Sequence, residues 1–298
     1  MIITFGNGKG GTGKTTISLA TASEAANRGQ RVLVVDLDVQ GNATEHLIGT
    51  GDPLRPAGDQ GRGFYRTIMD GDALTPTRAR DNIDLMPAGT RTQSLADELN
   101  RIASGSADNV GRAFAALREM LHEATSGYDL VIIDTPPSEQ SHGLLDCVLV
   151  AADAAVIPTK TSKDDITGAV KFLQRLAALD RLGITYAIPL GAALVAVPSG
   201  ATRVEARAHA DLKLITDHLP LFDTRITYRL APVTEAARRH LTLHELAEQV
   251  PTNRVRLRQI GKTDGATEHI THDSITKSVA EIAALYDEIL TRYTEAMA

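Results

Sequence analysis

One segment near the amino terminus constrains the fold of this chain more than any other. Residues 8–15 have the sequence GKGGTGKT, directly after the apolar run 2–5 and before a helical pattern that includes 20–28 and stops at Gly29. Glycines let a backbone turn its N–H groups inward around an oxyanion, and the helix that follows presents its amino terminus to the same anion. A strand, a glycine-rich loop and a helix in this order therefore predict a site for nucleotide phosphates.

The chemistry of the loop residues indicates a role for each. The Lys14 ammonium would neutralise the β- and γ-phosphates, the Thr15 hydroxyl would ligate Mg²⁺, and Thr16 continues the turn toward the α-phosphate. The expected ligand is thus a nucleoside triphosphate with Mg²⁺. The loop residues expected to contact it are Gly10, Gly11, Thr12, Gly13, Lys14, Thr15 and Thr16.

Short β-rich apolar runs alternate with longer helical patterns along the chain. The runs are 2–5, 32–35, 130–133, 154–157 and 190–197, and the clearest helical patterns are 20–28 and 110–124. This alternation implies βαβ units with right-handed crossovers. We therefore expect an α/β fold in three layers, with a mostly parallel central sheet, helices on both faces and ligands at the carboxyl ends of the strands.

Three segments interrupt this alternation. Residues 49–63 are rich in Gly, Pro and Asp and predict a long loop, residues 104–109 predict a short one, and the pattern breaks again over 251–273. His269 and His272 fall in the last segment and are expected to be loop histidines, because no acids or cysteines accompany them at metal-ligand spacing. A final helix is expected over 275–293. We expect residues 1–250 to form one domain, and residues 251–298 to form a basic loop and a carboxyl-terminal helix packed on that same domain.

Composition limits the classes of function that remain. A net charge of −6 and a pI near 5.9 argue against a protein that coats nucleic acid through its overall field, although a local basic patch is compatible with them. The one cysteine, Cys147, lies in an apolar run and is expected to be a buried thiol. Neither a signal peptide pattern nor a bilayer-spanning apolar stretch is evident, which indicates a cytoplasmic protein without a membrane partner.

Three aspartates follow buried strands and should meet the phosphates. Asp36 and Asp38 come at the end of the run 32–35, and alternation along an extended chain places both on the same side. Asp134 ends the run 130–133, where its carboxylate would hold a magnesium-bound water. In the alternative interpretation, Asp36 and Asp38 cap the turn that follows them.

These motifs together resemble the deviant Walker signatures of the ParA/MinD superfamily of P-loop ATPases. The matching segments are KGGTGKT at 9–15, DLDVQGN at 36–42 and LVIIDTPP at 130–137, with Val39 where relatives usually have proline. The resemblance implies a three-layer P-loop NTPase fold in which Lys9 crosses a dimer interface to the partner's nucleotide, although a merely solvated Lys9 is the alternative. It also implies that Asp38 holds or activates the attacking water, and that Asp36 lies nearer the magnesium shell.

The resemblance continues to about residue 250 and favours one branch of the superfamily. Segment 151–159 resembles the family's strand after Walker B. Segments 224–237 and 241–243 resemble the late strand and loop of plasmid and chromosome ParA proteins, which implies adenine contacts near Thr227 and Arg229. The nitrogenase iron protein requires paired cluster ligands that Cys147 alone cannot supply. MinD-type members carry a basic amphipathic tail, whereas the last helix here is acidic. Because the chain starts at the first strand, we expect it to lack the amino-terminal DNA-reading domain of longer ParA types.

A ParA-type protein would be a slow ATP hydrolase that dimerises on ATP and binds DNA nonspecifically, so it would be associated with the nucleoid. It would drive plasmid or chromosome partition together with a ParB-like centromere-binding partner. The alternatives are an ATPase scaffold that positions a protein cargo, a MinD-like regulator, and a small-molecule ligase-like P-loop enzyme. Basic residues would contact DNA phosphates and make binding dependent on salt. The candidates are Arg203, Arg207, Arg225, Arg229, Arg238 and Arg239, with Arg254, Arg256 and Arg258 as a second group.

Overall fold

The computed structural model describes residues 1–49, 58–105, 107–136, 142–185, 187–197, 206–207, 210–211, 219–227, 230–250 and 271–298. Seven strands in this part of the chain form one sheet in the order β3-β4-β2-β5-β1-β6-β7. Every neighbouring pair is parallel except the antiparallel pair β3–β4. The strands are β1 (Ile2–Phe5), β2 (Val32–Asp36), β3 (Thr77–Arg80), β4 (Ile83–Met86), β5 (Leu130–Asp134), β6 (Ala154–Thr159) and β7 (Ile188–Leu194).

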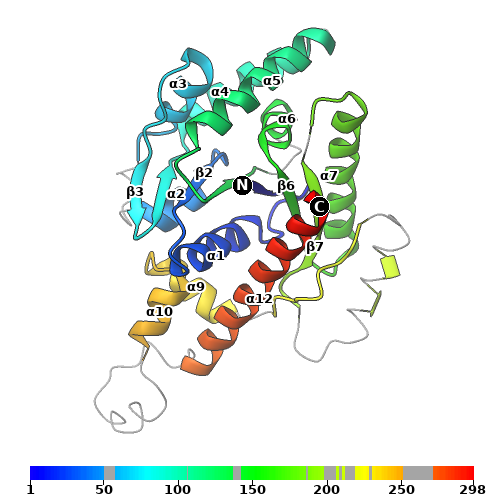
Figure 1. Ribbon diagram of the computed structural model, residues 1–298. Coiled ribbons are helices and arrows are strands. Elements are labelled where there is room, and N and C mark those ends of the chain that lie inside the picture. Colours follow the sequence, from blue (N-terminus) through cyan, green and yellow to red (C-terminus); the bar gives the residue numbers. More distant parts are fainter. Residues whose placement is uncertain are drawn as a thin grey trace.

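Helices cover both faces of this sheet, which confirms the expected three layers. Figure 1 shows α1, α9, α10 and α12 on one side and α3 to α6 on the other. Alternate strand residues face opposite ways, so Val32 and Val34 pack with α1 and α12 while Leu33 and Val35 pack with α4 and α6. The helices are α1 (Lys14–Asn27), α2 (Asn42–Ile48), α3 (Arg62–Asp70), α4 (Thr90–Ala103), α5 (Ala107–Ala124), α6 (His142–Ala151), α7 (Lys163–Arg181), α9 (Leu230–Arg238), α10 (Leu243–Gln249) and α12 (His272–Met297).

Several predicted boundaries were wrong. The expected loop 104–109 ends early because α5 begins at Ala107, and polar residues such as Asp and Asn are typical of helix starts as well as of loops. His272 is the first residue of α12 rather than a loop residue, because Thr271 caps that helix by accepting the Ser274 N–H at 3.2 Å. Strand β7 begins at Ile188 and ends at Leu194, two or three residues before the predicted limits.

The hairpin of β3 and β4 was not predicted from the sequence. Strand β3 reads TRAR and lies at the exposed edge of the sheet, so it lacks the apolar run that marks a buried strand. Within the predicted loop 49–63, residues 50–57 lie outside the described part, and α3 begins at Arg62. His269 and the basic stretch 254–258 also lie outside the described residues.

The structure also places Cys147 and the last helix. Cys147 is buried in α6 as expected, and burial raises the pKa of its thiol. Helix α12 packs along α1 (Figure 1), where Ile282, Leu285 and Ile289 are buried in the same core cluster as Ile17 of α1. Among the described helices, none is both long enough and apolar enough to cross a membrane.

Candidate nucleotide-binding site

The glycine-rich loop has the backbone that the sequence requires. Gly11 and Gly13 have φ values of 73° and 92°, in the left-handed region that residues with a Cβ disfavour. Gly13 is the N-cap of α1, and a Cβ added there would lie 3.2 Å from the Val195 side chain. The loop therefore ends at the amino terminus of α1, where unpaired N–H groups and the helix dipole favour an anion.

The buried side chain of Asn7 fastens this loop to the neighbouring elements. Its amide nitrogen donates to the Pro158 carbonyl at 2.9 Å and to the Asp165 carbonyl at 3.3 Å, and its Oδ1 accepts the Lys9 N–H at 3.0 Å. The Gly8 N–H also donates to the Gly168 carbonyl of α7 at 3.0 Å. Sequence reasoning missed Asn7, for which the available signal was a polar residue between a buried strand and the loop.

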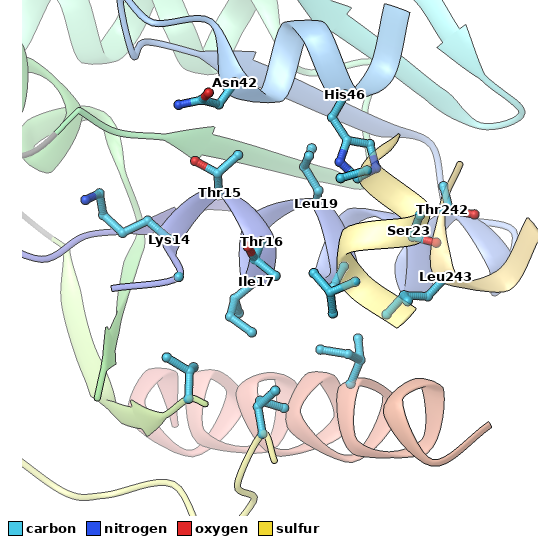
Figure 2. Close-up of a pocket in the computed structure, with 18 of the residues that line it drawn as sticks. Lys14, Thr15, Thr16, Ile17, Leu19, Ser23, Asn42, His46, Thr242 and Leu243 are labelled. Atoms are coloured by element: carbon cyan, nitrogen blue, oxygen red, sulfur yellow. The ribbon is translucent and has the colours of Figure 1, made fainter. Parts of the chain in front are cut away.

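A cavity of about 600 Å³ opens beside the loop. Figure 2 shows Lys14, Thr15 and Thr16 at the start of α1, with Asn42 and His46 across from them on α2. The cavity lining also includes the loop glycines Gly10, Gly11 and Gly13, together with Asp38 and Lys160, the last of which was not predicted from the sequence. Thr12 does not line the cavity, because its side chain is buried and its hydroxyl donates to the Lys9 carbonyl at 3.5 Å.

Asp134 lies against the first turns of α1. Its Oδ2 accepts the Thr15 hydroxyl at 2.7 Å and its Oδ1 accepts the Ser18 hydroxyl at 3.1 Å. Thr15 and Asp134 were both expected near magnesium, and the fold brings them together from segments 119 residues apart. Ser18 was missed, because one serine in a helix carries no signal until Asp134 lies beside it.

Asp36 has both of its carboxylate oxygens engaged by the loop that follows β2. Its Oδ1 accepts the Asp38 N–H at 3.1 Å, and its Oδ2 accepts the Thr44 N–H and hydroxyl at 2.8 and 2.7 Å. This is the turn-capping geometry that was the alternative interpretation, and it holds Asp38 at the cavity. A direct role of Asp36 at magnesium stays a prediction.

Electrostatics at this edge of the sheet favour a divalent cation. Asp36 and Asp134 are register neighbours on β2 and β5, and both are fully buried. Burial raises the pKa of both carboxyls, and the charge of Asp134 raises that of Asp36 further. Burial also lowers the pKa of Lys14, although Asp134 and Asp38 oppose this shift. Buried oxygen ligands with a shortage of positive charge fit Mg²⁺, so the residues present suit that ion.

Lys9 is directed toward α7 and does not line the cavity beside its own loop. Its Nζ lies 3.2 Å from Asp165 Oδ1 and 3.9 Å from Asp164 Oδ2, both at the start of α7, and its side chain is 42% exposed. Lys14 has the opposite environment, since it is buried and its Nζ donates to the Lys9 carbonyl at 3.1 Å. The two lysines of one loop therefore differ in direction as well as in exposure.

Family models match most of the chain. The AAA domain model covers residues 1–183 and the VirC1 protein model covers residues 106–282. A chromosome-partitioning ATPase, Soj of Thermus thermophilus, is 33% identical over 71% of this chain and 75% of its own length. The chain belongs to the ParA/MinD superfamily of P-loop ATPases.

Solved structures of ParA/MinD proteins share this fold. An ATP complex of a McdA variant from Cyanothece superposes with a TM-score of 0.68 at 20% identity, covering 94% of this chain and 95% of that one. The cell division ATPase MinD of Pyrococcus furiosus gives a TM-score of 0.56 at 19% identity, with 95% and 98% covered. These likenesses confirm the fold class.

The remaining residues predicted from the ParA resemblance have mixed outcomes. Thr227 lines the cavity, and its N–H and hydroxyl both donate to Glu281 of α12, whereas Arg229 lies outside the described residues. Arg238 and Arg239 are both bonded to Glu235, and exposed Arg207 pairs with Asp211 at 3.9 Å. Arg225 is exposed, and Arg203 lies outside the described residues. The DNA-contacting role of this group stays a prediction.

Proposed function

We propose that this protein is an ATP-switched partition ATPase. Mg·ATP binds in the cavity, two copies close across their nucleotides, and the dimer binds DNA without sequence preference. A ParB-like centromere-binding partner then stimulates slow hydrolysis and release. The observation that supports the proposal is the direction of Lys9, whose half-exposed side chain lies outside its own cavity and pairs with Asp165. In the proposed dimer this ammonium serves the nucleotide of the second copy. The name of the Soj relative supports the partition role.

In this proposal the chain positions the triphosphate and uses no covalent intermediate. Loop N–H groups and Lys14 would hold the β- and γ-phosphates, and Thr15 with Asp134 would hold Mg²⁺, which would supply positive charge to the phosphate oxygens. Asp38, kept at the cavity by Asp36, orients the attacking water. Phosphoryl transfer to water depends mainly on such positioning and charge neutralisation.

Two single substitutions test the catalytic assignment. Asp38→Ala should reduce ATP hydrolysis by about 100-fold or more while Mg·ATP still binds, because the carboxylate acts on the water and not on the phosphates. Lys14→Ala should impair both binding and hydrolysis. Calorimetry and phosphate release measure the two properties separately. Normal hydrolysis by Asp38→Ala would show that another residue orients the water.

The partition role is tested by sedimentation and filter binding with random-sequence DNA. With ATP and Asp38→Ala, which keeps nucleotide bound, we expect a dimer that retains DNA at low salt and releases it as salt rises. With ADP we expect a monomer that does not retain DNA. An ATP-dependent dimer without DNA binding would instead favour the scaffold for a protein cargo. A protein that stays monomeric with ATP would favour a small-molecule ligase-like enzyme.

A further inference from the structure

The acidic residues of α12 hold a segment that borders the cavity. Glu288 accepts the backbone N–H groups of Asp223 and Thr224, at 2.8 and 3.0 Å. Glu281 accepts the Thr227 N–H at 3.0 Å through Oε2 and the Thr227 hydroxyl at 2.7 Å through Oε1. Because seven residues make about two turns, both carboxylates lie on one face of the helix. We refer to residues 223–227 as the 223–227 segment.

The two carboxylates act at opposite ends of this segment. Near Glu288, Arg292 adds bonds to the Leu190 and Leu221 carbonyls, at 2.9 and 2.6 Å, and its guanidinium lies 4.2 Å from the centre of the Phe222 ring. That end is therefore fastened to β7. At the other end Thr227 lines the cavity, and Glu281 sets the direction of its hydroxyl.

This arrangement decides which hydrogen bonds Thr227 offers to a ligand. A hydroxyl has one proton to donate and two lone pairs that accept. The proton of Thr227 is committed to the Glu281 carboxylate, which is acceptor-only when ionised. A ligand that reaches this oxygen can therefore only donate to it, so its complement on a ligand is a donor. A purine nucleoside carries such donors in the amino group of adenine and in the ribose hydroxyls.

We propose that Glu281 is a positioning residue of the nucleotide site, which orients Thr227 to accept a hydrogen bond from the nucleoside part of ATP. The proposal rests on the proposed binding of Mg·ATP. In this proposal two elements recognise two parts of ATP. The loop at 8–15 holds the phosphates, and Glu281 of α12 orients the residue that contacts the nucleoside.

Calorimetry on the full chain tests this division with two probes, Mg·ATP and magnesium tripolyphosphate, which has no nucleoside. We expect Glu281→Ala to weaken Mg·ATP binding about ten-fold and to leave tripolyphosphate affinity unchanged. Glu281→Gln, which keeps one accepting oxygen, should recover part of the loss. Thr227→Val should show the same selective loss as Glu281→Ala, and the double variant should lose little more than either single one.

Asp287→Ala is the matched control. Asp287 pairs with Arg28 and so ties α12 to α1 without touching the 223–227 segment. It should leave both affinities at the wild-type value. An equal loss for ATP and tripolyphosphate, or the same loss in Asp287→Ala, would overturn the proposal and assign Glu281 a general packing role. If Glu281→Ala fails to fold, as judged by circular dichroism, Thr227→Val carries the same test.

Analogues identify the donor. Purine riboside triphosphate lacks the amino group, while 2′-deoxy-ATP and 3′-deoxy-ATP each lack one hydroxyl. The analogue that lacks the donor should bind wild type as weakly as ATP binds Thr227→Val. Its affinity for Thr227→Val should be no lower than its affinity for wild type. If Thr227→Val weakens all three analogues as much as ATP, the acceptor role is wrong. If wild type binds no Mg·ATP, the proposed function itself is wrong. If wild type binds Mg·ATP normally but the variants lose affinity for Mg·ATP and tripolyphosphate alike, this inference alone is wrong.

Discussion

At the scale of single residues, the most consequential feature is a pair of buried carboxyls with little positive charge near them. Asp36 and Asp134 lie on adjacent strands, and burial raises the pKa of both. Lys14 offsets part of their charge at Asp134. In the proposed function Asp134 receives magnesium, and a site made to receive a cation is less stable before the ion arrives.

This pair predicts a pH dependence of stability in the protein without nucleotide. Because the folded pKa values lie above the ordinary value of 3.8, the folded state holds more protons than the unfolded state over the window up to neutral pH. The pair's contribution to the free energy of unfolding should therefore fall as the pH rises through that window. Asp134→Asn removes one carboxyl and keeps one of its two oxygens, which can accept from one of the two hydroxyls, that of Thr15 or that of Ser18.

The comparison of this variant with wild type isolates the effect. Between about pH 5 and about pH 8, we expect the free energy of unfolding of Asp134→Asn to rise relative to wild type by on the order of 1 kcal/mol. Urea denaturation followed by circular dichroism measures it. A constant difference across this range would mean that Asp134 does not titrate there and would contradict the prediction. The variant should also lose affinity for Mg·ATP.

At the scale of elements, α7 acts as a support for the phosphate-binding loop. The Gly168 carbonyl accepts the Gly8 N–H, and a Cβ on Gly168 would meet Asn7 Oδ1 and lie 2.9 Å from the Lys9 backbone nitrogen. The backbones of the helix and the loop therefore approach each other closely. This contact explains why a glycine stands at position 168 inside α7, although glycine lowers helix propensity.

Gly168→Ala should displace the loop. We expect it to weaken Mg·ATP binding about ten-fold or more while the far-ultraviolet circular dichroism stays that of wild type, because the clash falls on the loop backbone rather than on the core. Gly111→Ala in α5 is the matched control, since its Cβ would meet just the Ile184 side chain, at 3.3 Å. Unchanged nucleotide affinity in Gly168→Ala would mean that the loop does not depend on its contact with α7.

At the scale of the whole molecule, the ends of the sequence meet. Helix α12 lies along α1, and Tyr286 is buried where its hydroxyl donates to Gln30 and its ring lies 5.1 Å from the guanidinium carbon of Arg28. Residues of α12 also line the cavity that begins at the phosphate-binding loop. We therefore expect the last helix and residues 1–250 to unfold as one unit, although residues 251–270 lie between them in the sequence.

Leu285→Ala tests this expectation. Leu285 is fully buried between α12 and the rest of the core, so the substitution should lower the free energy of unfolding by about 2–5 kcal/mol in a single transition. Glu295→Ala, at an exposed position of the same helix, should change it by less than about 0.5 kcal/mol. A second, separate transition at lower urea would show that α12 folds independently.

Local patterns along the chain are enough to predict the fold class and the phosphate-binding part of the site. The glycine-rich loop, the alternating strands and helices and the carboxylates at strand ends are each encoded within a few neighbouring residues. Gly13, Thr15 and Asp134 can therefore be identified from the amino-acid sequence alone. Such features are local because backbone conformation and hydrophobic periodicity depend on neighbours along the chain.

The contacts between distant groups follow from the folded arrangement and not from any local pattern. Three sets of contacts join segments that are far apart in sequence. Asn7 and Gly168 support the loop, Ser18 donates to Asp134, and Lys9 pairs with Asp165. The acidic residues of α12 had indicated a helix unsuited to membranes, whereas the fold uses Glu281 to orient Thr227. A side chain's partner depends on packing across the sheet, and no pattern within one segment encodes that position.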